Sequence, residues 1–158
     1  MLIIKPAGKK GKGVFANKNF KKGETLLTMD YTKRKDFVLR KNIQKLPQKD
    51  QDHLDYVGHN RYVVDYSIGS IVNHSCEPNA YVKYETMRKK ELIAIKNIKK
   101  CEEITIDGAI DAADNWTMKC YCGKNCRKTI YGNYKKLPKE LQKKYWKYVP
   151  RWKKMQIR

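Results

Sequence analysis

The chain has 158 residues, the length of one ordinary domain, and it carries 36 Lys and Arg residues against 16 Asp and Glu residues, a formal net charge of +20. No run approaches the ~18 consecutive apolar residues of a membrane-spanning helix, and no charged, apolar and small-residue secretion signal opens the chain. We therefore exclude a membrane role and expect an intracellular protein, in the cytoplasm, the nucleoid or the nucleus.

Short runs rich in β-branched and aromatic residues alternate with turn residues along most of the chain, which is typical of a mainly β fold. Residues 34–56 are largely polar and predict short helical turns and loop. Without reference to any family, this pattern favours a small β barrel or sandwich. The expected strands are residues 2–5, 13–16, 25–29, 62–65, 80–84, 92–95 and 104–107, with 80–84 and 92–95 forming a hairpin turned at 87–90.

The last quarter of the chain has a different character. Pro138 suits the first position of a helix, and Leu141 and Tyr145 follow at a helical spacing. We expect an amphipathic basic helix at residues 139–148, within a basic C-terminal helix and tail over residues 133–158. The excess of lysine has two interpretations: a base-composition bias of the genome, or non-specific binding to nucleic acid or an acidic protein through long-range attraction.

Three of the five cysteines, Cys120, Cys122 and Cys126, lie within seven residues. In a chain without a secretion signal, this pattern favours a metal site over disulfide bonds. Cys76 is a further potential ligand, whereas Cys101 lies in a lysine-rich turn and is not expected to bind metal. The alternative is a set of free thiols, or disulfides in an oxidising compartment.

The run Asn73-His74-Ser75-Cys76-Glu77-Pro78-Asn79 concentrates polar side chains directly after the small apolar residues 68–72. Pro78 lacks a backbone donor, so the run is not the interior of an ordinary helix. We expect the run to be buried, and buried polar groups need hydrogen-bonding partners. A bound ligand with many polar atoms is one source of partners; the alternative is an Asn and a His satisfied within the protein.

This run closely resembles the signature of the SET-domain protein-lysine methyltransferases, and three other segments resemble the same family in the right order. Residues 11–16 resemble its opening glycine loop and residues 102–107 its closing strand. The pattern Cys120-Tyr121-Cys122, followed by three residues and Cys126, resembles its zinc-binding post-SET segment. The resemblance extends over roughly residues 1–132.

The resemblance implies a specific fold and division of the chain. The fold is the SET (β-clip-like) fold, mainly β, with several small sheets, short helices and a knot-like C-terminal crossing, which is rare among folds. The implied parts are a SET domain at residues 1–110, a post-SET zinc-binding segment at residues 111–132, and the basic C-terminal helix and tail.

The resemblance also implies transfer of a methyl group from S-adenosylmethionine to a lysine of a protein substrate. In SET domains the residues matching Asn73 and His74 lie against the cofactor, partly through their backbone groups. The glycine loop fits the same site, and an aromatic residue often follows the closing strand. The expected cofactor-binding residues are Gly11, Lys12, Gly13, Phe15, Asn73, His74 and Trp116.

Zinc is the second expected cofactor. The family uses the cysteine matching Cys76 as a zinc ligand, which completes a set of four with Cys120, Cys122 and Cys126. Three residues separate Cys122 from Cys126 where the family usually has four, so the loop is tighter but still reaches the metal.

The main departure from the family is Gly108, which stands where the closing strand is followed by a tyrosine. Without that hydroxyl and ring we expect a gap in the methyl-transfer pocket, so that cofactor binding survives and methyl transfer is slow. Tyr62 and Tyr66 are the candidates for a substitute. The second hypothesis is a SET-fold binding protein, weak or inactive in catalysis, that associates with nucleic acid or chromatin-like complexes.

Overall fold

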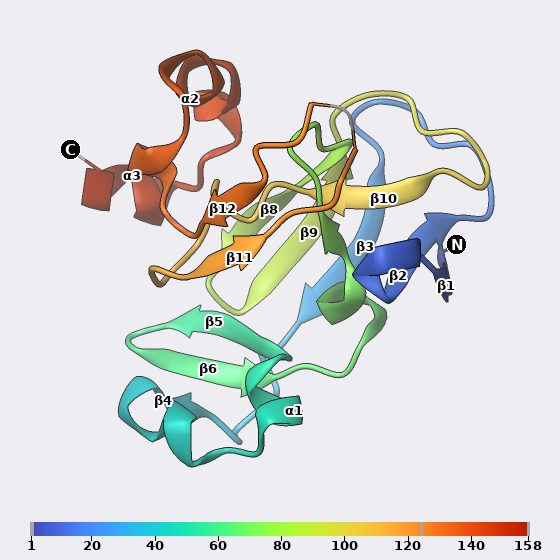
Figure 1. The fold of residues 1–158 in the computed structure, drawn as a ribbon. Helices are drawn as coiled ribbons and strands as arrows, with labels where there is room; N and C mark the ends of the chain where they lie inside the picture. Colours follow the sequence, from blue (N-terminus) through green and yellow to red (C-terminus); the bar gives the residue numbers. More distant parts are fainter. Residues whose placement is uncertain (1, 124, 158) are drawn as a thin grey trace.

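The computed structural model describes residues 2–123 and 125–157. Within these ranges the chain folds into small β-sheets joined by turns and short helices (Figure 1). This arrangement confirms the mainly β class and the several small sheets. No helix in the described ranges has the length and apolar character needed to cross a membrane.

One sheet joins the N-terminal hairpin to the polar run. Its strands, in spatial order, are β1 (Leu2–Pro6), β2 (Lys12–Ala16), β10 (Glu103–Ile106) and β7 (Asn73–His74). β10 is antiparallel to β2 and parallel to β7, so that Thr105 faces Asn73. Val14 and Ile104 are fully buried in its core. A late strand therefore lies between early ones, an insertion that the predicted knot-like crossing requires.

A second sheet packs against the first. It contains β3 (Thr25–Asp30), β9 (Lys89–Ala94) and β8 (Ala80–Thr86), in that order. The strands confirm the expected positions, and β8 and β9 form the expected hairpin. The turn is shorter than expected because pairing continues as far as Thr86 and Lys89. Ala80 and Leu92 share one apolar core with the first sheet.

A third sheet forms the cyan and green part of Figure 1. It contains β4 (Val38–Leu39), β6 (Arg61–Val64) and β5 (Leu54–Gly58), beside the 3-10 helix η2 (Arg40–Lys45) and the short helix α1 (Gln48–Gln51). The helical turns were expected, but β4 and β5 were not. His59 and Asn60 join β5 to β6 with φ values of 52° and 55°. Two positive φ values are the feature of a type I′ hairpin turn, which this sequence builds without glycine at either central position.

The C-terminal part of the chain contains a hairpin and a group of short helices. They are β11 (Thr117–Lys119), β12 (Thr129–Tyr131), η4 (Tyr134–Lys136), α2 (Lys139–Tyr145), η5 (Trp146–Tyr148) and α3 (Arg151–Ile157). The expected helix at 139–148 is confirmed in position, although its last turn is a 3-10 helix.

The expected tail is instead largely the helix α3, which packs against the body of the protein. The Trp152 ring centroid lies 5.6 Å from that of Tyr56 and 5.9 Å from that of Tyr84. Lys153 Nζ donates a hydrogen bond to the carbonyl oxygen of Ala112 at 2.6 Å. These contacts make α3 a structural element, so deleting it would uncover aromatic side chains of β5 and β8.

Candidate functional site

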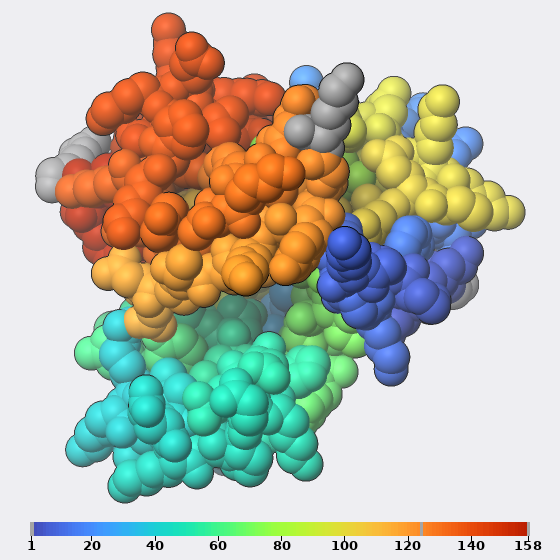
Figure 2. All heavy atoms as spheres, in the orientation of Figure 1, coloured from blue at the N-terminus to red at the C-terminus, as the bar shows by residue number. Residues whose placement is uncertain are grey.

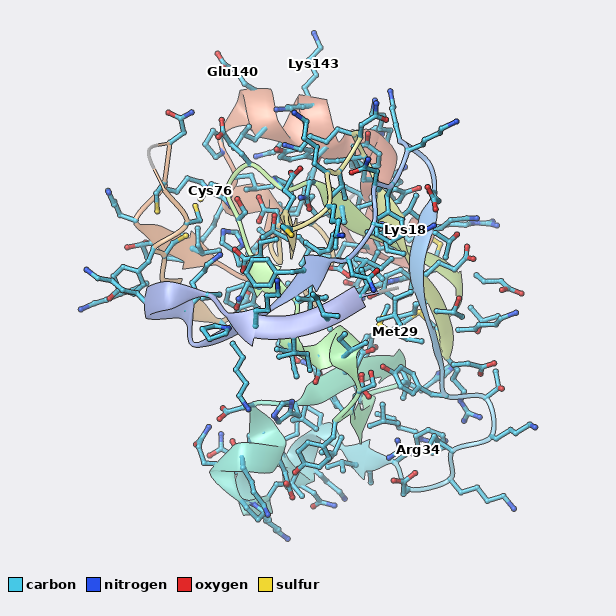
Figure 3. All side chains as sticks on the ribbon, turned by 90° about the vertical axis from the view of Figure 1, so that its right-hand side faces the viewer. Lys18, Met29, Arg34, Cys76, Glu140 and Lys143 are labelled. Carbon is cyan, nitrogen blue, oxygen red and sulfur yellow. The ribbon has the colours of Figure 1, made fainter. Side chains whose placement is uncertain are left out.

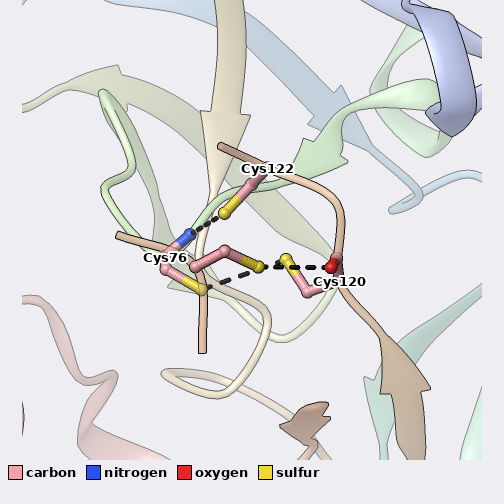
Figure 4. Close-up of side chains that lie close together, drawn as sticks. Cys76, Cys120 and Cys122 are labelled. Atoms are coloured by element: carbon pink, nitrogen blue, oxygen red, sulfur yellow. Dashed lines mark hydrogen bonds between the residues drawn. The ribbon is translucent and has the colours of Figure 1, made fainter. Parts of the chain in front are cut away.

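Four cysteines from distant parts of the chain meet in one cluster (Figure 4). The Sγ atoms of Cys76, Cys120, Cys122 and Cys126, hereafter the cysteine cluster, all lie within 4.8 Å of one another. The Sγ atoms of Cys76 and Cys120 are 3.9 Å apart. Tetrahedral zinc with Zn–S bonds near 2.3 Å separates its sulfurs by about 3.8 Å, so the donor set fits zinc. Cys101 is exposed and lies outside the cluster, as expected.

The surroundings of the cluster act in both directions on its thiols, whose thiolate form binds metal. Arg127 donates hydrogen bonds to Cys76 Sγ from its backbone nitrogen at 3.3 Å and from Nε at 3.2 Å. The Lys128 backbone N–H donates to Cys126 Sγ, and this bond is the main cause that lowers the pKa of Cys126 to about 7. Burial acts in the opposite direction and raises the pKa of Cys76.

His74 links the cysteine cluster to the end of β10. The Gly108 N–H donates to His74 Nδ1 at 3.3 Å, and His74 Nε2 lies 3.5 Å from Cys76 Sγ. Burial lowers the pKa of His74 to about 4, which keeps the ring neutral near pH 7. Arg127 adds a parallel link through its ion pair with Asp107, at 2.7 Å. The ring of His74 is therefore engaged within the protein.

Asn73 clamps the glycine loop to β10. Its Nδ2 donates to the Lys12 carbonyl oxygen and to Glu103 Oε1, both at 2.9 Å. A Cβ on Gly13 would lie 2.8 Å from Asn73 Nδ2 and 2.7 Å from Glu103 Oε1. A glycine is thus needed at position 13 so that the side-chain amide of Asn73 can lie close to the backbone of β2. The amide hydrogens of Asn73 therefore have partners within the protein, without any ligand. An Asn satisfied in this way was the alternative considered from the sequence.

We expect Asn73→Ala to destabilise the protein even without a cofactor, because two acceptors lose their donor. The expected loss in free energy of unfolding is about 1–3 kcal/mol, measured by urea denaturation of the cofactor-free protein. Asn97→Ala is the matched control, since the Asn97 side chain accepts one exposed hydrogen bond from the Lys22 backbone. Equal losses in the two variants would contradict a clamp at Asn73.

A small hollow lies beside this clamp, with a volume of about 420 Å³. We call it the Asn73 cavity; its lining residues are Lys12, His53, Ser70, Ile71, Val72 and Asn73. Gly11 is exposed at φ 76°, where nothing lies within 4 Å of a Cβ position, and Phe15 is half-buried on β2 opposite Ile3 and Glu103. Of the expected cofactor residues, Lys12 and Asn73 line this hollow. The other five are not part of its lining: Gly11, Gly13, Phe15, His74 and Trp116.

A larger cavity separates the third sheet from the rest of the molecule, where Figure 2 shows a hollow between the cyan and the orange segments. Its volume is about 460 Å³. We call it the tyrosine cavity, because Tyr56, Tyr62 and Tyr84 line it together with Gly108 and Trp116. Three of the expected site residues, far apart in sequence, therefore meet here.

Tyr66 lies outside the tyrosine cavity. Its side chain is 59% exposed, and its hydroxyl donates a hydrogen bond to Asp50 on the surface. Tyr62, by contrast, is only 4% exposed and donates its hydroxyl hydrogen to Asp114, which also pairs with Arg40. Of the two tyrosines considered from the sequence, only Tyr62 is positioned to face a ligand in the cavity.

Desolvation, followed by the hydrogen bond to Asp114, raises the pKa of Tyr62 and keeps its hydroxyl protonated. A second pair of the same kind is formed by Tyr84 and Asp111, whose oxygen atoms are 3.0 Å apart. Burial raises the pKa of Asp111 to about 6. Tyr84, Asp111 and Asp114 were not predicted from the sequence, where no motif marks them.

Trp116 lies beside Gly108, the position where the sequence predicts a gap, and Gly108 itself lines the tyrosine cavity. A Cβ on Gly108 would lie 3.1 Å from Cζ2 and 3.2 Å from Cη2 of Trp116. The indole ring therefore lies directly against the glycine. Trp116, which the sequence predicts as a cofactor-binding residue, lines the tyrosine cavity.

The tyrosine cavity is acidic although the chain as a whole is strongly basic. Lys90 is the single Lys or Arg side chain among the described lining residues, and it is 1% exposed and paired with Asp55. The lining aspartates are Asp52, Asp55, Asp65, Asp111 and Asp114. Local charge therefore favours entry of a cationic side chain, which the overall charge did not indicate.

Comparisons with known proteins agree on one family. The model of the SET domain matches residues 11–107, more than half of the chain. An H3 lysine-36 specific histone-lysine N-methyltransferase of Debaryomyces hansenii is 41% identical over 70 residues, covering 42% of this chain and 10% of that protein. An H3 lysine-9 specific enzyme of Nicotiana tabacum is 34% identical over 73 residues, covering 41% of this chain and 10% of that protein.

A solved structure supports the fold. The crystal structure of a putative histone methyltransferase of Plasmodium falciparum superposes with a TM-score of 0.52 and 24% identity, over 68% of this chain and 96% of that chain. The match spans about a tenth of the length of the curated relatives named above.

Proposed function

Because this chain belongs to the SET-domain family, we propose that it is a protein-lysine N-methyltransferase that moves a methyl group from S-adenosylmethionine to a lysine of a protein substrate. The observation that carries the proposal is that the two cavities are adjacent. The Asn73 cavity and the tyrosine cavity share His53, Ser70 and Val72 in their linings. A cofactor held in the first and a lysine held in the second are therefore neighbours, as methyl transfer requires.

The cofactor would be held by residues of the Asn73 cavity, with Lys12 and Asn73 as its polar neighbours from the signature segments. S-adenosylmethionine supplies the electrophilic methyl group when bound. Gly11 and the backbone groups of His74 stay proposed contacts, because both belong to the glycine loop and the polar run that adjoin this cavity. Zinc is proposed at the cysteine cluster, where the donor set fits it. There it would hold in place the hairpin of β11 and β12, hereafter the post-SET hairpin.

The tyrosine cavity would bind and orient the substrate lysine. Its aspartates attract the ammonium group and by themselves raise the lysine pKa above its ordinary value near 10.4. Desolvation among the tyrosine rings acts in the opposite direction, so formation of the neutral amine requires desolvation to outweigh the aspartates. Tyr62 donates its hydroxyl hydrogen to Asp114. The lone pairs of its oxygen are therefore available to accept a hydrogen bond from the substrate nitrogen. This arrangement would align the nitrogen for attack, which is catalysis by positioning.

Histones are the proposed substrate class, and the nucleus the proposed location, because the relatives named above are histone-lysine methyltransferases. The test incubates the zinc-loaded protein with isotope-labelled S-adenosylmethionine and recombinant histone H3. Mass spectrometry should find labelled methyl groups on lysine. A protein that leaves the histone and its own lysines unlabelled, while remaining folded, would refute the proposed function.

Non-specific nucleic-acid binding is a second candidate property, favoured by the surface of the C-terminal helices. Figure 3 shows Glu140 and Lys143 projecting outward from α2. Lys139, Lys143 and Lys147 are exposed, and Trp146 beside them is 41% exposed. Since α3 packs against the body, charge substitution tests this surface better than deletion.

We expect replacement of Lys139, Lys143 and Lys147 by glutamine to weaken DNA binding and to reduce its salt dependence. Three lost phosphate contacts would flatten the slope of log affinity against log salt by about 2.7, measured by fluorescence anisotropy. The matched control replaces the exposed Lys41, Lys45 and Lys49 near the third sheet. Equal slopes for the two triple variants would show that α2 and η5 are not the binding surface.

A further inference from the structure

Trp116 lies in a slot that is made by two glycines. At Gly108, an added Cβ would meet the indole at 3.1 Å. At Gly132, an added Cβ would lie 2.3 Å from Cε2 and Nε1 of Trp116. Any side chain at Gly132 would displace the ring, because real Cβ atoms do not approach this closely.

The slot is attached to the cysteine cluster through the post-SET hairpin. The Gly132 N–H donates to the Trp116 carbonyl oxygen at 2.8 Å, and β11 and β12 continue the pairing from there. Ile130 of β12 is 1% exposed and packs against Cys76 and Cys120. Ligation of the cysteines therefore fixes the same hairpin that places Trp116 against Gly108.

We propose that Trp116 is the specificity-determining wall of the lysine-binding cavity, in the position where the family has the side chain of a tyrosine at 108. This inference rests on the proposed function. The indole reaches the tyrosine cavity from the post-SET hairpin, whereas a tyrosine at 108 would reach it from the end of β10. One ring fills the space in either case, so Gly108 accommodates Trp116 and is not a defect.

The proposal makes the two positions mutually exclusive, which a set of variants can test. Gly108→Tyr alone should slow single-turnover methylation of recombinant histone H3 by at least about tenfold, because two rings compete for one space. Combining it with Trp116→Ala should recover most of that loss. Gly108→Tyr that matches or exceeds the unmodified protein, or a double variant no faster than Gly108→Tyr, would overturn the proposal.

The number of methyl groups is a second readout that a merely structural role would not move. Trp116→Phe keeps an aromatic ring but shortens the wall, so the cavity should accept a more highly methylated lysine. Mass spectrometry should then show at least one methyl group more per lysine than the unmodified protein adds. An unchanged product distribution, at a rate within a factor of about three, would assign Trp116 to packing alone.

The location of the ring is tested independently of activity. Gly132→Ala should lower the melting temperature, and Trp116→Ala in the same protein should recover part of the loss because the clash is removed. No recovery would overturn the slot itself, whatever the enzyme does. A recovered melting temperature with no methyl transfer by the unmodified protein would instead refute the proposed function, and with it the role of Trp116 in substrate selection.

Discussion

Cys120→Ser is expected to prevent zinc from binding at the cysteine cluster and to abolish most methyl transfer. Cys120 is buried at the centre of the cluster, 3.9 Å from Cys76 in Sγ separation. Structural zinc in small peptide domains contributes about 10–16 kcal/mol of apparent binding energy. If zinc binding adds only about 4 kcal/mol to the free energy of unfolding of this chain, loss of the zinc lowers the melting temperature by roughly 8–16 °C.

The rate of methyl transfer should fall when zinc is lost, because the cysteine cluster then no longer fixes the post-SET hairpin. Trp116 would leave its slot, and the pairs of Arg127 with Asp107 and with Cys76 would loosen beside Gly108. We expect a fall of at least about a hundredfold in single-turnover rate. Elemental analysis, melting temperature and rate are measured on the same preparation. Cys101→Ser is the matched control, since Cys101 is exposed and outside the cluster. Full metal content in Cys120→Ser would show that the ligand set is wrong.

Tyr62→Phe is expected to slow methyl transfer by about a hundredfold, the usual effect of removing one oriented polar group from an active site. The ring and its packing stay, but the oxygen proposed to accept a hydrogen bond from the substrate nitrogen is lost. Asp114 keeps its pair with Arg40, so we expect the fold to survive. The measurement is the single-turnover rate on histone H3 at saturating cofactor, with the melting temperature as a check on folding.

Tyr66→Phe is the matched control for this prediction. It removes the same hydroxyl from an exposed tyrosine bonded to Asp50, outside the tyrosine cavity. Its rate should lie within about a factor of two of the unmodified protein. Equal rates in the two variants would remove Tyr62 from the mechanism and leave Tyr84, bonded to Asp111, as the next tyrosine of the cavity.

The local pattern was sufficient to predict most strands of the first two sheets. Val14 and Ile104 lie in short β-branched runs bounded by turn residues, and such runs keep their structure when packed against one another. β5 could not be predicted because its turn, His59-Asn60, adopts positive φ without glycine, and its Asp55 is stabilised by the buried Lys90 of β9. That partner lies far away in sequence.

The residues of the cysteine cluster and of the tyrosine cavity were predictable from the sequence to different degrees. Spacing and the polar run were enough to predict the cysteine cluster, because three ligands are close in sequence and Cys76 belongs to the signature. Of the tyrosine cavity, Tyr62, Gly108 and Trp116 were expected as site residues, whereas Tyr84 and Asp114 reach it from segments without a motif. The relation of Trp116 to Gly108 depends on pairing between β11 and β12, which fixes where the indole lies.

The most direct test of the central claim is a crystal structure of the zinc-loaded protein with S-adenosylhomocysteine and a lysine-containing histone H3 peptide. We predict the cofactor product in the Asn73 cavity, and the lysine side chain in the tyrosine cavity with its nitrogen beside the hydroxyl of Tyr62 and against Trp116. A lysine bound elsewhere, or a tyrosine cavity filled by the cofactor itself, would contradict the account.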